Sequence, residues 1–220
     1  MVPQLLIFDC DGVLIDSEII VNRVHAEVRT ELGYPISTEE MLNRFVGLGS
    51  QSKELIDDLK QLPKNYRSIL KPKLNEALKN ELIPIKGIVP ILNKIRIKKC
   101  IASGSSIEKL NFTLGLTGIN KYFEDKIFSS HMVKNPKPAP DLYLYVAKKM
   151  GVKPSQCLVV EDSSTGVKGA LNAGMKVIGF MAGSHFTPTL KKKLLFSGAH
   201  HFAKSAKDLK TYFQESGILN

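Results

Sequence analysis

The sequence predicts an α/β protein in which helices cover both faces of a parallel sheet. From residue 85 onward, short apolar segments typical of strands alternate with segments of helical periodicity, which favours such a sheet. An apolar run at residues 5–8 predicts a first buried strand. Residues 17–82 have helical periodicity and little strand character. We therefore expect a helical segment inserted after the first strand.

Length and composition are those of an ordinary globular protein. The chain of 220 residues has enough material for one or two domains. It has no apolar stretch long enough to span a membrane, and its N-terminal segment lacks the pattern of a signal peptide. Three cysteines, Cys10, Cys100 and Cys157, lie at or beside predicted strands and do not form a zinc pattern. We expect reduced thiols, a cytoplasmic location and no membrane partner.

The net charge of +10 raises the possibility of a nucleic-acid partner. Lysines cluster at residues 98–99, 148–149 and 191–193, but no nucleic-acid-binding motif is recognisable and the aromatic residues do not interleave with them. We therefore expect a solvated, lysine-rich surface that helps to attract anionic substrates, and no nucleic-acid partner. The five histidines match no metal-ligand or catalytic-triad spacing.

Two aspartates, Asp9 and Asp11, directly follow the first predicted strand. Their i, i+2 spacing places both side chains on one side of an extended segment, at the strand end where open α/β sheets bind ligands. Two acids this close repel unless a cation or a shared proton intervenes, and Mg²⁺ suits carboxylate oxygens. A turn that merely ends the strand is the alternative. An EF-hand is excluded because Val13, Ile15 and Ile20 replace required ligands.

Regular elements are predicted along the rest of the chain. Ser37 and Glu40 have the spacing of a capping box, which predicts a helix start within the inserted segment. Further strands are expected near residues 100–103, 126–129, 157–161 and 176–180, and helices near 89–98, 106–115, 140–150, 164–173 and 206–215.

A small, hydroxyl-rich loop, residues 103–106, ends the strand at 100–103. Ser105 and Glu108 have capping-box spacing, so a helix should start there. The Ser103 hydroxyl and the backbone N–H groups around Gly104, beside a helix N-terminus, make a candidate phosphate site. An ordinary strand-to-helix turn is the alternative, because the Walker lysine and its spacing are absent.

Two later segments also place charged residues before helices. Pro138 and Pro140 restrain Lys137, which favours it over Lys134 as a fixed positive charge for a phosphoryl oxygen or an aspartate. The strand at 157–161 ends in the acids 161–162, which reach the site of Asp9 if the two strands are neighbours. Alternatively, these acids only complement a helix N-terminus, which either Ser163 or Ser164 could cap.

These four segments, in this order, resemble the haloacid dehalogenase-like (HAD) hydrolase superfamily. The resemblance rests on residues 9–13, Ser103, Lys137 and the pair Glu161-Asp162. It extends to residues 14–18, 137–141 and 161–166, which are similar to the subgroup of β-phosphoglucomutase and 6-phosphogluconate phosphatase-like proteins.

The resemblance implies a Rossmann-like core, residues 1–16 and 83–220, with an inserted α-helical cap, residues 17–82. It also implies adjacent first and fourth strands and a Mg²⁺-dependent phosphatase acting on a small phosphorylated metabolite, a sugar or sugar-acid phosphate. Asp9 would attack phosphorus and form an aspartyl phosphate, and Asp11 would transfer the protons. Mg²⁺ would be bound by Asp9, the Asp11 carbonyl and Asp162, with Glu161 a ligand directly or through water. Ser103, Gly104 and Lys137 would bind the phosphate.

Other features bear on substrate and reaction. Glu18 and the loop at residues 44–49, which contains Arg44, Gly47 and Gly49, are candidate substrate contacts of the cap; a surface charge and simple turns are the alternatives. Val21 stands where related mutases carry a histidine, and His25 is one turn later.

Neither Ser50 nor Gln51 supplies the mutase arginine, so a phosphatase is favoured over a hexose-phosphate mutase. Asp11 argues against a dehalogenase. A non-catalytic protein that binds phosphometabolites is the remaining alternative.

Overall fold

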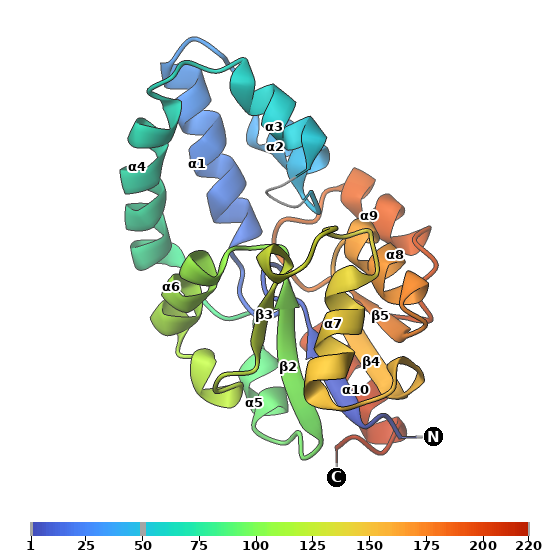
Figure 1. Ribbon diagram of the computed structural model, residues 1–220. Coiled ribbons are helices and arrows are strands. Elements are labelled where there is room, and N and C mark those ends of the chain that lie inside the picture. The colour runs from blue at the N-terminus through green and yellow to red at the C-terminus, as the bar shows by residue number, and fades with distance from the viewer. Residues whose placement is uncertain (1, 49–51, 220) are drawn as a thin grey trace.

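A six-stranded, fully parallel sheet lies at the centre of the molecule (Figure 1). The structure is a computed structural model that describes residues 2–48 and 52–219. The strand order is β3-β2-β1-β4-β5-β6. The strands are β1 (Leu5–Phe8), β2 (Lys98–Ser103), β3 (Ile127–Ser129), β4 (Cys157–Glu161), β5 (Lys176–Phe180) and β6 (His201–Ala203). The predicted α/β, Rossmann-like class is confirmed.

Helices fall into two groups. The first four that follow β1 in the chain are here called the helical insertion: α1 (Glu18–Glu31), α2 (Thr38–Phe45), α3 (Lys53–Lys60) and α4 (Tyr66–Glu81). The others belong to the sheet core: α5 (Ile88–Leu92), α6 (Ile107–Thr117), α7 (Asp141–Met150), α8 (Ser164–Asn172), α9 (Pro188–Leu195) and α10 (Ala206–Glu215), with short 3₁₀ helices η1 (Asn120–Tyr122), η2 (Ser130–Met132) and η3 (Pro154–Gln156).

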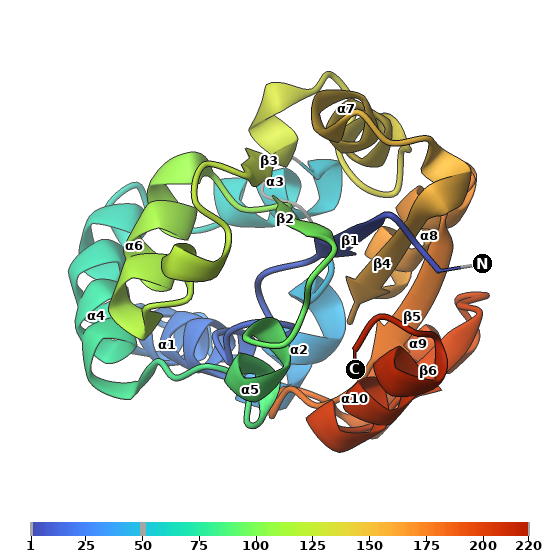
Figure 2. The ribbon, with the colours of Figure 1, turned by 90° about the horizontal axis from the view of Figure 1, so that it is seen from below.

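Alternate residues of β1 point into two apolar layers. Leu6 and Phe8 pack in a cluster with side chains of α5, α6 and α10 and of α1 and α4, whereas Leu5 and Ile7 pack with those of α7 and α8. Figure 2 shows α7 and α8 on one side of the sheet and α5 and α10 on the other. The first layer therefore joins the helical insertion to the sheet core.

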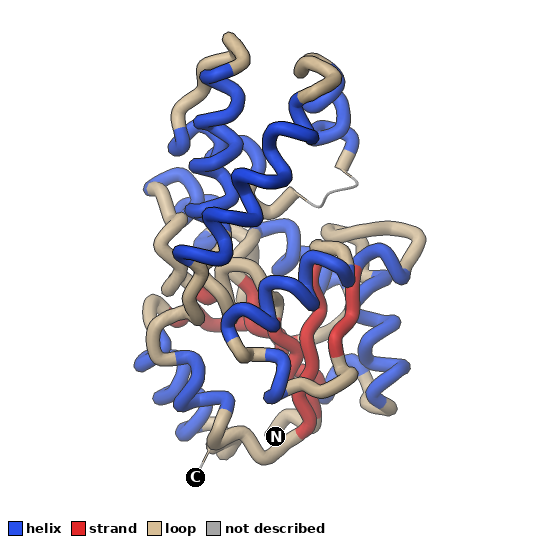
Figure 3. The backbone as a smooth tube through the Cα atoms, turned by 90° about the vertical axis from the view of Figure 1, so that its left-hand side faces the viewer, coloured by secondary structure: helices blue, strands red, loops and turns tan. Residues whose placement is uncertain are grey.

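The helical insertion stands beyond the carboxyl ends of the strands (Figures 1 and 3). β1 pairs with both β2 and β4, and Ile7 lies opposite Cys100 on one side and Val159 on the other. The loops that follow these three strands therefore meet beneath the insertion. The predicted domain limits at residues 16–17 and 82–83 stay a prediction. None of the described helices is long and apolar enough to cross a membrane.

Several local predictions are confirmed and others are wrong. The capping box of Ser37 and Glu40 is present, and Ser163 rather than Ser164 caps α8. The helix expected over 89–98 ends at Leu92, because Lys98 already pairs with Leu5 in the sheet. α9 was not predicted, and β6 begins at His201, where either a strand or a surface segment was expected.

Candidate active site

A tight turn after β1 presents the two aspartates. The Asp9 N–H donates to the Val160 carbonyl of β4 at 3.0 Å. The pairing of β1 with β4 therefore continues to Asp9, the first residue after β1. Gly12 follows with φ of +76°, a conformation that glycine adopts without strain. A Cβ atom at Gly12 would lie 1.9 Å from Oδ2 of Asp162. Glycine is therefore required here both by conformation and by space.

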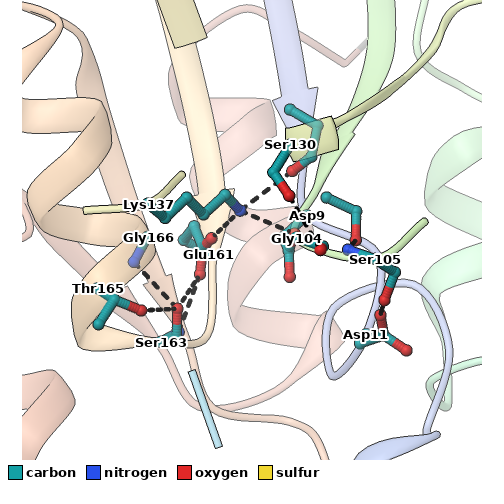
Figure 4. Close-up of polar contacts among 12 residues, drawn as sticks. Asp9, Asp11, Gly104, Ser105, Ser130, Lys137, Glu161, Ser163, Thr165 and Gly166 are labelled. Atoms are coloured by element: carbon teal, nitrogen blue, oxygen red, sulfur yellow. Dashed lines mark hydrogen bonds and ion pairs between the residues drawn. The ribbon is translucent and has the colours of Figure 1, made fainter. Parts of the chain in front are cut away.

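Lys137 connects the loop after β1 with the carboxyl ends of β2 and β4. Its Nζ donates to Oδ1 of Asp9 at 2.9 Å, to Oε1 of Glu161 at 2.5 Å and to the Ala102 carbonyl at 3.1 Å. Figure 4 shows the ammonium group between the two carboxylates. Its rival Lys134 is exposed. The acids raise the pKa of Lys137 despite its burial, so the ammonium stays charged.

Glu161 is held by neighbours on several sides. Besides Lys137, it accepts hydrogen bonds from Tyr143 Oη at 3.1 Å and from the N–H and Oγ of Ser163, both at 2.9 Å. A Cβ at Gly166 would lie 1.7 Å from Glu161 Oε1, so α8 can approach only with glycine there. Glu161 thus holds the Lys137 ammonium group through one carboxylate oxygen and the start of α8 through the other.

Three buried carboxylates, those of Asp9, Glu161 and Asp162, offer oxygen atoms that all lie within 4.8 Å of one another. Burial raises the pKa of Asp9 well above its ordinary value, and Glu161 and Asp162 act in the same direction against Lys137. Burial and the charges of Glu161 and Glu18 also raise the pKa of Asp162. One lysine therefore leaves the cluster short of positive charge. A hard divalent cation such as Mg²⁺ fits this all-oxygen donor set.

Asp11 points away from this cluster and has different partners. Ser17 Oγ donates to its Oδ1 at 2.6 Å, Ser105 Oγ donates to its Oδ2 at 2.7 Å, and Lys109 Nζ lies 3.1 Å from Oδ1. Burial acts to raise the pKa of Asp11, but Lys109 and the two hydroxyls outweigh it, so the net pKa is lowered. Two carboxylates two residues apart thus have unlike environments.

The loop after β2 differs in detail from its prediction. Ser106, not Ser105, caps α6 by accepting from the Lys109 N–H, which frees Ser105 to bind Asp11. Buried Ser103 accepts from the Ser105 N–H at 3.1 Å. Ser130 Oγ donates to the Gly104 carbonyl at 3.0 Å (Figure 4), which ties this loop to the one after β3.

A cavity of about 460 Å³ lies between these loops and the helical insertion. The predicted residues that line it are Asp9, Asp11, Glu18, Gly47, Ser103, Gly104, Lys137, Glu161 and Asp162. Arg44 is not among the described lining residues; its guanidinium pairs instead with Asp58 at 3.0 Å. Gly49, Ser50 and Gln51 lie outside the described residues.

Sequence reasoning missed the part that several polar side chains play in lining the cavity. Lys109 and Ser105 are four residues apart, which places them on one side of the helix start and could have signalled their pairing at 3.1 Å. Asn22 Nδ2 donates to Glu18 Oε2 at 3.0 Å. His25, which the spacing placed too late, lines the cavity together with Val21, and its Nδ1 lies 2.6 Å from Tyr66 Oη.

Comparisons with known proteins identify the family. The haloacid dehalogenase-like hydrolase family matches residues 6–180. The chain belongs to this family. The 6-phosphogluconate phosphatase of Escherichia coli is 31% identical over 197 residues, which are 87% of this chain and 88% of that protein. Such phosphatase-named relatives support a phosphoric monoester hydrolase.

Solved structures agree in fold over nearly the whole chain. A conserved haloacid dehalogenase-like protein of unknown function from Agrobacterium tumefaciens is 36% identical, with a TM-score of 0.84 over 97% of this chain and 99% of that chain. A HAD family hydrolase from Deinococcus radiodurans, with bound phosphate and sodium, is 28% identical, with a TM-score of 0.83 over 99% and 97%.

Proposed function

We propose that this chain is a Mg²⁺-dependent phosphatase of a small phosphorylated sugar or sugar acid, acting through an aspartyl phosphate. One observation carries the proposal: Asp9 and Asp11 both line the cavity, but the groups that surround the two carboxylates differ. Lys137 and two further acids surround Asp9, whereas hydroxyls and Lys109 surround Asp11. The relative that acts on 6-phosphogluconate and the neighbour with bound phosphate support the substrate class.

Asp9 is the nucleophile in this proposal. A carboxylate oxygen of Asp9 attacks phosphorus, the ester P–O bond breaks, and the phosphoryl group moves to Asp9. Lys137 neutralises the charge that would otherwise keep a carboxylate and a phosphate apart. Ser103 and the N–H groups at the start of α6 would bind the remaining phosphoryl oxygens.

Asp11 is the proton carrier. A proton from Asp11 goes to the leaving oxygen; the Asp11 carboxylate then takes one from the water that attacks the aspartyl phosphate, which releases inorganic phosphate. Lys109, Ser17 and Ser105 favour the carboxylate form, which is the form that the second half of the reaction needs. The negative charge of a bound phosphate opposes that effect and favours the protonated form for the first half.

Asp9, Asp162 and the Asp11 carbonyl would hold Mg²⁺, with Glu161 as a ligand directly or through water. The cation would supply charge neutralisation at the phosphoryl group. The helical insertion would act as a cap over the site, with Glu18 and Gly47 close to the substrate. All three cysteines are buried and free, in keeping with the cytoplasmic location that we propose.

Phosphate release from a panel of sugar and sugar-acid phosphates, with Mg²⁺ and with a chelator, tests the proposal. We expect phosphate release that requires Mg²⁺ and is absent in Asp9→Asn. Any phosphate release that persists in this variant would come from contaminating phosphatases. The panel includes β-glucose 1-phosphate with a trace of the bisphosphate, because isomerisation faster than phosphate release would identify a mutase. Val21 stands in the cavity wall where related mutases carry a histidine. Its side chain cannot donate or accept a hydrogen bond, which favours hydrolysis over mutase chemistry. Binding without turnover would indicate a non-catalytic protein.

A further inference from the structure

His185 lies next to the candidate cation site, although nothing in the proposed reaction uses it. It stands in the loop between β5 and α9, and its side chain is completely buried. Neither ring nitrogen has a hydrogen-bond partner among the described residues. A buried polar group without a partner is rare and calls for an explanation. Oδ2 of Asp162 lies 3.2 Å from Nε2.

The surrounding backbone holds the ring in this place. A Cβ at Gly12 would lie 2.8 Å from Cε1 of His185, and a Cβ at Gly183 would lie 2.5 Å from its Nδ1. The Phe186 ring packs against the imidazole with 4.3 Å between the ring centroids. Two glycines therefore make room for the ring beside Asp162, and no larger residue fits at either position.

The ring of His185 lies beside Asp162 but is not one of the possible metal ligands. The described group of possible metal ligands consists of Asp9, Glu161 and Asp162, without His185. Nε2 is within donor distance of Asp162 Oδ2 but out of line for a full hydrogen bond. A hydrogen bond between them therefore requires a change in the direction of the Asp162 carboxylate or of the ring. Burial lowers the pKa of His185, which favours a neutral ring with one N–H.

We propose that His185 is a positioning residue that donates from Nε2–H to Asp162 Oδ2 and so orients the other oxygen of Asp162 toward a divalent cation. Groups that hydrogen-bond to metal ligands fix the ligand's direction and contribute to affinity. The inference rests on the cation site of the proposed function, and it adds a residue outside the acid cluster.

The test is cation affinity, measured without substrate. Isothermal titration calorimetry with Mg²⁺ alone, and with Mn²⁺ alone, would compare wild type with His185→Leu, His185→Gln and His185→Asn. The amide of glutamine reaches the place of Nε2, whereas the amide of asparagine is one bond shorter. Phe186→Leu is the matched control, because it loosens the same packing and removes no donor.

We expect His185→Leu to weaken binding roughly tenfold or more, as is common for such outer partners. His185→Gln should bind more tightly than His185→Asn, and Phe186→Leu should bind as wild type even if its melting temperature falls. If His185→Leu does not fold, the Gln and Asn pair decides, since equal affinities would overturn the proposal. Equal losses in all variants, Phe186→Leu included, would reduce His185 to packing. A wild-type protein that binds neither ion would overturn the cation site itself.

Discussion

The two walls of the cavity are built from different chemistry. The wall from the sheet core carries acids, lysines and hydroxyls, and hydrogen bonds of 2.9 and 2.5 Å connect Lys137 with Asp9 and Glu161. The wall from the helical insertion is mostly apolar, with the side chains of Val21, Met41, Phe45, Val46, Leu48, Leu55 and Leu74. Its polar groups are those of Glu18, Asn22 and His25.

This difference follows from the part of the fold that supplies each wall. The core residues of the site lie at the carboxyl ends of parallel strands or in the loops and helix starts that follow them, so the sheet sets their positions. The insertion wall consists of helix faces and the loop after α2, whose side chains belong to no strand of the sheet. We infer that the core wall performs the chemistry and the insertion wall selects the leaving group. Substitutions on the two walls should therefore fail in different ways.

The largest effect is expected at the nucleophile. Asp9→Asn keeps the shape of the side chain but removes the attacking charge and a proposed cation ligand. Turnover with every substrate should fall by at least ~10³-fold, as expected when the group that forms the covalent bond is lost. Steady-state phosphate release checks this, with Asp125→Asn, an exposed acid outside the cavity, as the control. Metal-dependent turnover near the wild-type rate would contradict the mechanism.

A smaller and selective effect is expected at the proton carrier. Asp11→Asn keeps the backbone carbonyl but cannot transfer a proton. Alkyl phosphates, whose leaving groups need protonation, should lose about 10²- to 10⁴-fold in kcat, and an activated aryl phosphate should lose much less. The measurement is the ratio of kcat values for the two substrate types. An equal loss for both would show that Asp11 does not act as the general acid.

The strand-end residues were predictable because an apolar strand that stops at polar residues is visible in one short stretch of sequence. Asp9, Asp11 and the pair 161–162 follow buried strands, and the structure brings them to one cavity. The family resemblance supplied the adjacency of β1 and β4, which local patterns do not contain. Gly12 had a visible signal as a turn residue, but its closeness to Asp162 needed the fold.

The residues that were missed depend on packing between distant segments. Lys109 binds Asp11 across 98 positions of sequence only because α6 starts beside the turn after β1. His185 follows β5 by several residues in an irregular loop, where neither periodicity nor spacing marks a functional place. Arg44 stays a predicted substrate contact, but its exposed guanidinium pairs with Asp58 on α3, and it is not among the described residues that line the cavity.

A modest effect on selection is expected in the insertion wall. Leu55 on α3 lines the cavity, and its neighbour Ile56 is 38% exposed and does not line it among the described residues. Leu55→Ala should lower kcat/KM for a hexose phosphate by roughly 3- to 10-fold, since part of a leucine's apolar contact is lost. The loss should be smaller for glycerol phosphate, and Ile56→Ala should leave both values unchanged. Equal losses for both substrates would argue against a selective wall.

The smallest effect concerns the pH dependence of the free energy of unfolding, to which His25 in the insertion wall contributes. Burial lowers the pKa of His25 to about 4; Arg29 and Lys109 act in the same direction, and Asp58 opposes them. An unfolded histidine has a pKa of about 6.5. Between these values the unfolded chain binds a proton that the folded chain does not. The contribution of His25 to stability is therefore present above pH 6.5 and is lost as the pH falls toward 4.

His25→Gln should reduce this loss. Urea unfolding at pH 7, 6 and 5 would measure it, because all other titrating groups are common to both proteins. The free energy of unfolding should fall more steeply with decreasing pH in wild type, by up to about 1.4 kcal/mol per pH unit, the value for one proton. His201→Gln, at a histidine outside the cavity, controls for the loss of a titratable side chain as such. Parallel curves for wild type and His25→Gln would show that His25 takes up its proton equally in both states, so that the apolar insertion wall does not exclude charge.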